Sequence, residues 1–207
     1  MLTYKINLRN NIVAHPFLYL ASRSPRRVEL LKQIGITCET LPADIDESQL
    51  HGELPERYVT RLAQEKAEAC LINLTAEQRK HAILAADTTV VLAGKILGKP
   101  EHDEDARVML HSLSGSMHQV HTAVALAYAG NVEVVLSTTL VEMMVISHAQ
   151  IEAYIATGEH RDKAGSYGIQ GAAGVWIKRI EGSYTGVMGL PIYETASLLR
   201  KYQLIAL

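Results

Sequence analysis

The chain has 207 residues, and its 20 Lys plus Arg against 22 Asp plus Glu give a formal net charge of -2. This length predicts one catalytic unit, either a single domain or two lobes around a shared sheet, and excludes a large multidomain protein. The near-neutral charge gives no global attraction to nucleic acid or to an anionic membrane, so any phosphate-binding site has to be local.

Residues 1–16 are interpreted as an N-terminal extension, because periodic structure starts only at Phe17. They lack the continuous apolar run of a signal peptide or a membrane span. Pairing of this extension as an edge strand is the alternative. Cys38 and Cys70 have no partner at metal-ligand spacing, which is typical of reduced thiols in a reducing compartment. We therefore expect a cytoplasmic protein that binds no membrane.

Strands and helices alternate along residues 17–207, which predicts one α/β domain with a mixed β-sheet. Apolar patterning predicts strands over 17–21, 82–86, 89–92, 119–128 and 132–146, and the last two should form a long antiparallel hairpin. A further strand pair is expected on either side of Glu181-Gly182. Helices are predicted over 25–34, 55–72, 103–113, from the capping box of Ser147 and Gln150 to 156, and over 191–202, where Pro191 suits a first turn.

A strand leads directly into a helix at residues 20–27, LASRSPRR, with Ser24 as the expected N-cap. Cations in a first helical turn cost roughly 0.3 to 1 kcal/mol each, because the helix N-terminus carries partial positive charge. Arg26 and Arg27 lie in that turn, so we interpret the junction as a site for a polyanion such as a triphosphate. A pair of solvated arginines is the alternative.

Asp87 and Thr88 directly follow one predicted strand and precede another. A carboxylate at the end of a strand can hold a divalent cation or accept a proton from an attacking water, although a turn aspartate is the alternative. The acidic run 44–47 supplies further oxygens of the kind that magnesium prefers, or is simply a solvated loop. Lys99, after a hairpin, and Lys66, on the second helix, are candidate cations, although lone lysines are usually surface residues.

Residues 162–174 contain closely spaced glycines, which let a backbone approach a ligand. Gln170 in this segment offers both a donor and an acceptor to the edge of a nucleobase. A plain glycine-rich loop is the alternative. The segment has neither the P-loop nor the Rossmann pattern, and the histidines of the chain show no zinc-ligand spacing.

Together these segments resemble the Maf family of nucleoside triphosphate pyrophosphatases, over essentially all of residues 18–203. The resemblance rests on six motifs in one order, namely LASRSPRRVELL at 20–31, ADT at 86–88, GKP at 98–100, LSG at 113–115, DKAGSYGIQG at 162–171 and GLP at 189–191. It implies an elongated mixed sheet with helices on either side, two lobes around a cleft, and commonly a homodimer. Ala86 departs from the family, in which a glycine commonly precedes the aspartate.

The resemblance also implies roles for individual residues. Asp87 matches the proton acceptor of the family, and Asp46 or Glu47 matches an acidic position that would bind Mg²⁺ or Mn²⁺ together with Asp87. The polar residues that match the lining of the cleft are Ser22, Arg26, Lys66, Lys99 and Gln170, and Arg27 is a further candidate for binding substrate, with a solvent-facing arginine as the alternative. The choice of nucleotide is expected to depend on Arg26, Thr88 and Gln170.

The branch of the family that this pattern resembles acts on dTTP and UTP. We therefore expect hydrolysis of these nucleotides, and of modified pyrimidine nucleotides, to the monophosphate and pyrophosphate. Hydrolysis of 7-methyl-GTP or of another nucleotide is one alternative. A nucleotide-binding regulator of cell division is a second, from a different class of protein.

Overall fold

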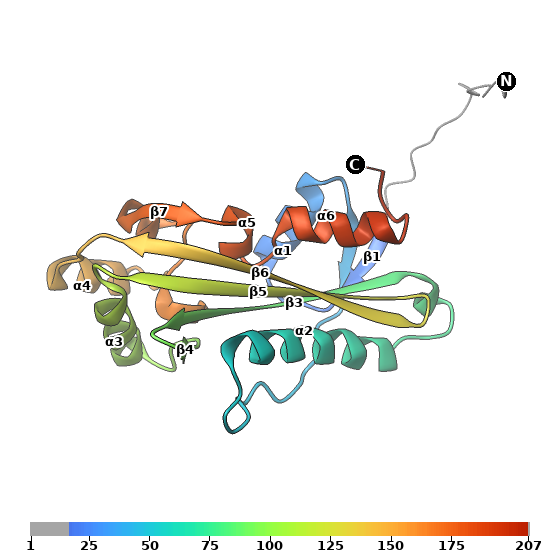
Figure 1. The fold of residues 1–207 in the computed structure, drawn as a ribbon, viewed down its shortest axis with the longest axis horizontal. Coiled ribbons are helices and arrows are strands. Elements are labelled where there is room, and N and C mark those ends of the chain that lie inside the picture. The colour runs from blue at the N-terminus through green and yellow to red at the C-terminus, as the bar shows by residue number, and fades with distance from the viewer. Residues whose placement is uncertain (1–16, 207) are drawn as a thin grey trace, which may run out of the picture.

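The computed structural model describes residues 17–206 (Figure 1), so the predicted extension over 1–16 lies outside the described residues. A mixed sheet of seven strands forms its centre, in the order β2-β1-β3-β5-β6-β7, with β4 paired to β3. The strands are β1 (Phe17–Leu20), β2 (Thr37–Thr40), β3 (Ala82–Leu92), β4 (Lys95–Leu97), β5 (Met117–Tyr128), β6 (Asn131–Met143) and β7 (Ile177–Glu181). Strand β1 is parallel to both of its neighbours and the other pairs are antiparallel, so the predicted α/β class is confirmed.

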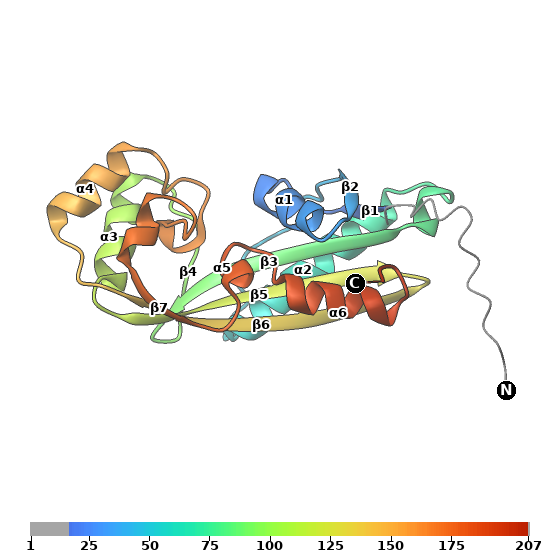
Figure 2. The same cartoon turned by 90° about the horizontal axis from the view of Figure 1, so that it is seen from above.

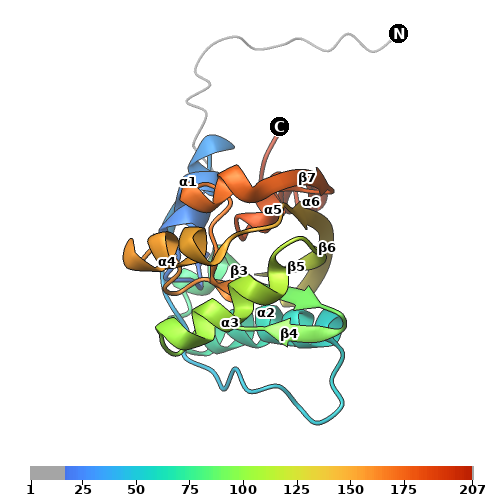
Figure 3. The same ribbon diagram turned by 90° about the vertical axis from the view of Figure 1, so that its left-hand side faces the viewer.

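Helices cover both faces of the sheet. They are α1 (Pro25–Gln33), α2 (Pro55–Ile72), α3 (Asp103–Leu113), α4 (His148–Ala156), α5 (Tyr184–Val187) and α6 (Ile192–Lys201), with 3-10 turns η1 (Gln78–Lys80), η2 (Ala164–Ser166) and η3 (Ala172–Trp176). Helix α2 lies against one face, and α1 and α6 lie against the other (Figure 2). Helices α3 and α4 pack together at the open end of the long β5–β6 hairpin, opposite its turn. This is the end that faces the viewer in Figure 3.

The alternation of side chains along β3 explains how the two layers form. Ile83 and Ala85 point to α2 and belong to the smaller apolar cluster, whereas Leu84 and Ala86 point to α1 and α6 and belong to the larger one. The larger cluster continues into α3 and α4, so one core joins both ends of the molecule. By the same alternation Asp87 continues the series that faces α2, and Thr88 continues the opposite series.

One predicted break in the sheet is wrong. Residues 82–86 and 89–92 belong to a single strand, β3, because β5 pairs with it without interruption from Ile83 to Val91. Asp87 is therefore inside a strand and does not end one. On its other side β3 pairs with β1 only up to Leu84 and with β4 only from Val90, so no described strand covers that flank at Asp87.

Smaller differences occur at the ends of elements. Residues 37–40 form the edge strand β2, which the polar sequence TCET does not predict. The expected strand after Gly182 is instead the short helix α5, begun by Ser183, whose hydroxyl accepts a hydrogen bond from Gly186 N. Strand β6 ends at Met143, before the predicted 146, and Pro191 is the N-cap of α6 and not part of its first turn. Within residues 17–206, none of the helices has both the length and the apolar composition to cross a bilayer.

Candidate active site

Several of the polar residues predicted from the sequence gather where one flank of β3 is uncovered. Strand β1 ends at Leu20, Ala21 N still donates to Leu84 O of β3 at 2.8 Å, and the chain then leaves the sheet to begin α1 at Pro25. Ser22 Oγ accepts a hydrogen bond from Ser24 N at 3.1 Å, which shapes this turn. Ser24 is the N-cap as predicted, but its side chain makes no capping hydrogen bond, so the start of α1 keeps uncapped amides.

A buried ion-pair group lies on the α2 side of this flank. Lys66 Nζ of α2 is 2.7 Å from Asp87 Oδ1 of β3 and 2.8 Å from Glu47 Oε1. The Lys66 and Asp87 side chains are only 12% and 11% exposed, whereas that of Glu47 is 47% exposed. One ammonium therefore holds two carboxylates, one of them almost out of water.

The two carboxyl groups have pKa values shifted in opposite directions. Burial raises the pKa of Asp87, and the opposing charges of Lys66 and Arg27 do not cancel that effect. Burial also acts to raise the pKa of Glu47, but its hydrogen bond to Lys66 and the charges of Lys66, Lys99 and Arg27 outweigh it, so this pKa is lowered. Burial thus disfavours the charged form of Asp87, whereas the cations around Glu47 favour its charged form.

The backbone around Glu47 is fixed by α2, although residues 41–54 contain no helix or strand. Tyr58 Oη donates to Glu47 O at 2.9 Å, and Arg61 Nη2 donates to Ser48 O at 3.0 Å. Arg61 also forms an ion pair with Glu53 at 2.7 Å. Asp46 is exposed, and its carboxylate accepts a hydrogen bond from Ser48 N within its own loop, so the contacts to Lys66 come from Glu47 and not from Asp46.

Arg27 occupies the opposite side of the flank and is half-buried. Its Nε donates to Gly189 O at 2.8 Å, Nη1 to Ser22 Oγ at 3.0 Å, and Nη2 to Thr88 Oγ1 at 3.3 Å. Burial lowers the pKa of Arg27, while the charge of Asp87 opposes this shift. The alternative of a solvent-facing Arg27 is therefore wrong, because this guanidinium joins the α1 turn to β3 and to the chain before α6.

Arg26 and Lys99 act on this group through their charges, and Gln170 lies in the glycine loop. The Nε atom of Arg26 is buried and has no hydrogen-bond partner among residues 17–206, and the charge of Arg26 acts on Tyr154 and Lys163 near the glycine loop. Lys99 is exposed, and its charge helps to lower the pKa of Glu47. Gln170 is exposed in the glycine loop.

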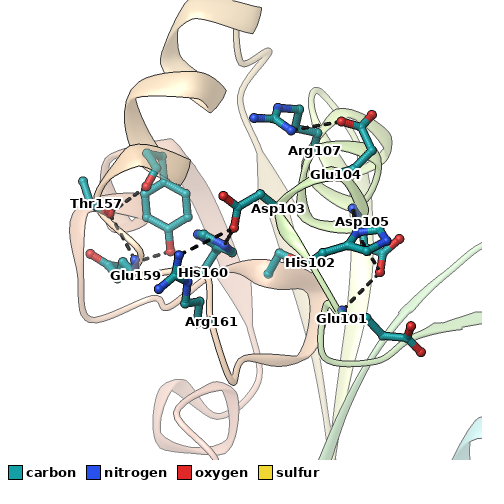
Figure 4. A network of polar contacts seen from close by, with 12 residues as sticks. Glu101, His102, Asp103, Glu104, Asp105, Arg107, Thr157, Glu159, His160 and Arg161 are labelled. Carbon is teal, nitrogen blue, oxygen red and sulfur yellow. Dashed lines mark hydrogen bonds and ion pairs between the residues drawn. The ribbon is translucent and has the colours of Figure 1, made fainter.

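The segments that carry Lys99 and Gln170 are tied to each other. Gly165 N donates to Gly98 O at 3.0 Å, directly beside Lys99. Just beyond, His160 Nε2 lies 3.0 Å from Asp103 Oδ1 at the start of α3, and Arg161 approaches the same carboxylate (Figure 4). The segment 160–165 is thus hydrogen-bonded to both ends of the short stretch 98–103.

Some residues of this network were not predicted from the sequence. Thr122 Oγ1 of β5 lies 3.0 Å from Thr88 Oγ1 and donates to Gly186 O at 2.8 Å, so it anchors Thr88 from the neighbouring strand. Only the register of the β3–β5 pair places these two threonines opposite each other. Tyr58 and Arg61 of α2 lacked a motif that would have marked them.

Comparison with known proteins places this arrangement in context. A family model described as "Maf-like protein" matches residues 17–202. The chain is 59% identical to a dTTP/UTP pyrophosphatase of Methylobacillus flagellatus over 88% of this chain and 91% of that one, and 53% identical to one of Chromobacterium violaceum over 89% and 94%. A dTTP/UTP pyrophosphatase of Nitrosomonas europaea is 51% identical over 89% and 93%. The solved Staphylococcus aureus Ham1 protein is similar over 61% of this chain and 71% of that chain, but a TM-score of 0.42 and 17% identity are too low to inform function.

Proposed function

This chain belongs to the Maf-like protein family, and from that premise we propose that it hydrolyses dTTP and UTP to the nucleoside monophosphate and pyrophosphate. The observation that supports this function best is the ion-pair group of Asp87, Lys66 and Glu47, in which Lys66 and Asp87 are buried. It combines a carboxylate suited to accept a proton with a second carboxylate that remains charged. The names of the three relatives mention neither the 7-methyl-GTP activity nor a role in cell division.

In the proposed reaction Asp87 is the proton acceptor. The oxygen of a water molecule bonds to the α-phosphorus, the bond from the α-phosphorus to the oxygen that bridges to the β-phosphate breaks, and the water proton passes to the Asp87 carboxylate. Burial raises the pKa of Asp87, and a base whose pKa lies nearer the working pH is the better acceptor. Lys66 holds this carboxylate in place from α2.

The proposed triphosphate site uses the cations around the α1 turn. Ser22 Oγ accepts hydrogen bonds from Ser24 N and from Arg27, which leaves its own hydroxyl hydrogen for a phosphate oxygen. Arg27 supplies a fixed charge behind Ser22, and Arg26 and Lys99 neutralise the phosphates and the leaving pyrophosphate. Charge held in advance where it develops in the transition state is the main contribution that a protein makes to phosphoryl transfer.

The carboxylates also fit a divalent cation. Mg²⁺ is usually held by one or two carboxylates, with phosphate and water oxygens completing its octahedral shell. Asp87 and Glu47 both contact the Lys66 ammonium, so their carboxylates face the same space, where they would hold such a cation. No three His, Cys, Asp or Glu side chains gather as a metal site within residues 17–206, so substrate oxygens would complete the shell. Mg²⁺ or Mn²⁺ bound there would neutralise phosphate charge.

Base selection is proposed to depend on Gln170, Arg26 and Thr88. The Gln170 amide has a donor and an acceptor, which suit the imide edge of uracil and thymine. We further propose a cytoplasmic homodimer that uses neither nucleic acid nor membranes, supported by the family resemblance and by the near-neutral net charge. The two-lobed organisation of residues 17–207 as one catalytic domain is part of the same proposal.

A nucleotide panel tests the function. Pyrophosphate release is measured with dTTP, UTP, CTP, GTP and 7-methyl-GTP, each with Mg²⁺, with Mn²⁺ and with a chelator. We expect metal-dependent release that favours dTTP and UTP, and an Asp87→Asn protein that folds normally should lose it. Tight binding of nucleotides without pyrophosphate release would refute the proposed enzyme.

A further inference from the structure

Glu159, just after α4, makes an unusual set of contacts with the glycine loop, residues 162–174. Its Oε1 accepts a hydrogen bond from Tyr154 Oη at 3.1 Å, and its Oε2 accepts one from Ala172 N at 3.0 Å. Lys163 Nζ donates to the backbone oxygen of Glu159. Figure 4 shows Glu159 beside Thr157, whose Oγ1 accepts from Glu159 N at 3.1 Å. The backbone and both carboxylate oxygens of Glu159 are therefore engaged.

Two glycines of the loop lie close to this carboxylate or to Lys163, which donates to the Glu159 backbone. A Cβ atom on Gly171 would lie 2.0 Å from Glu159 Oε1, and one on Gly168 would lie 2.9 Å from Lys163 Cε. Gly168 N also donates to Tyr154 Oη at 3.3 Å. The loop backbone thus lies directly on Glu159 and Tyr154, and a side chain at Gly171 would displace the Glu159 carboxylate.

These contacts fix the loop on both sides of Gln170. Gly168 is held before it and Ala172 after it, and the neighbouring Ile169 is buried in the core. Burial and the neighbouring charge of Glu159 raise the pKa of Tyr154, so its phenol keeps the proton that it donates. The backbone on both sides of Gln170 is therefore tied to Glu159 and to its hydrogen-bond partner Tyr154.

We propose that Glu159 is a positioning residue for nucleotide selectivity, because it holds Gln170 against the base while making no contact with the triphosphate. This inference rests on the proposed function, since it assigns a discriminating role within that same site. UTP and CTP have the same triphosphate and ring size but opposite donor and acceptor patterns on the base edge. Their relative kcat/KM therefore measures the placement of Gln170.

The test compares single and double variants. Glu159→Ala should lower the ratio of kcat/KM for UTP over CTP by about tenfold, the usual effect of losing one well-placed hydrogen-bonding group. This loss should arise mainly from KM for UTP, with kcat at saturating UTP little changed. In a Gln170→Ala background the further change Glu159→Ala should leave the ratio unaltered, because residues that act as a unit are not additive.

Two further variants make the result independent of folding. Tyr154→Phe removes only the hydroxyl group that contacts Glu159 and Gly168, and it should lower the same ratio. It replaces Glu159→Ala as the test variant if that protein does not fold. Glu152→Ala is the matched control, because Glu152 lies on α4, the helix of Tyr154, but pairs with Arg107 at 2.6 Å. Its ratio should equal that of the wild type.

The inference is overturned if Gln170→Ala leaves the ratio at the wild-type value. It is also overturned if the folded variant of Glu159 or Tyr154 leaves it there, or if the effects of Glu159→Ala and Gln170→Ala add. A wild-type protein that releases no pyrophosphate from any nucleotide removes the proposed function itself, which is a separate and recognisable result.

Discussion

Removing Lys66 should reveal the cost of burying Asp87. In Lys66→Met the Asp87 carboxylate, whose side chain is 11% exposed, loses a partner at 2.7 Å, and Glu47 loses the same cation. Leaving one charge of a buried pair without its partner typically costs about 3 to 5 kcal/mol. We expect the lower end, about 3 kcal/mol at pH 8, because Glu47 is half-exposed and can turn to solvent.

The same reasoning fixes the pH dependence of that loss. Without Lys66 the pKa of Asp87 in the folded protein rises further above its unfolded value, which is about 3.9. The folded variant then binds a proton more readily than the unfolded chain, so its stability falls as pH rises from about 4 upward. The destabilisation relative to wild type should therefore be large at pH 8 and small near pH 4.5.

Urea unfolding at pH 4.5 and pH 8 measures this difference. Lys80→Met is the matched control, because Lys80 pairs with Glu77 at the surface, with side chains 68% and 78% exposed, and such pairs contribute little. An equal loss of stability at both pH values, or a loss at pH 8 no larger than that of the control, would refute the reasoning.

Three other substitutions give distinct outcomes. Arg27→Lys keeps the charge but not the three directed hydrogen bonds, so kcat/KM for UTP should fall at least about tenfold. The control Arg23→Lys alters an exposed ion pair and should change kcat/KM little. If Arg27→Lys has the same kcat/KM as the control, the role of Arg27 is contradicted. Gly171→Ala should lower UTP affinity by displacing the loop from Glu159, and unchanged affinity by calorimetry would show that the loop adapts. Burial lowers the pKa of His118 to about 4, so protonation of the unfolded chain should remove about 2 kcal/mol of stability between pH 7.5 and pH 5. His118→Gln should lose correspondingly less in urea titrations at the two pH values, and an identical loss would contradict this assignment.

Local signals predicted most helices correctly. The bounds of α2 and α3 match the prediction, and the capping box of Ser147 and Gln150 is present at the start of α4. These elements follow from caps, glycine stops and a 3.6-residue period, which are properties of a short stretch of sequence. Strand β2 was not predicted because its TCET sequence is polar and mostly exposed, so only pairing with β1 makes it a strand.

The site was harder to predict than the fold. Asp87-Thr88 is predicted to break the sheet, yet it is extended because β5 pairs along it. The side chains of these two residues contact Lys66 and Arg27 at the uncovered flank of β3. An arginine at position 27 and a glutamate at position 159 do not by themselves indicate whether the side chain is buried or which residues it contacts. Their roles depend on contacts with Gly189 and Ala172, which only the folded chain brings near.

Hydrolysis of UTP in ¹⁸O-labelled water tests the central claim most directly, because the label marks the phosphorus that water attacks. The account predicts one labelled oxygen in UMP, unlabelled pyrophosphate, and loss of both products in Asp87→Asn. Label in the pyrophosphate, or release of UDP and labelled inorganic phosphate, would contradict attack at the α-phosphorus.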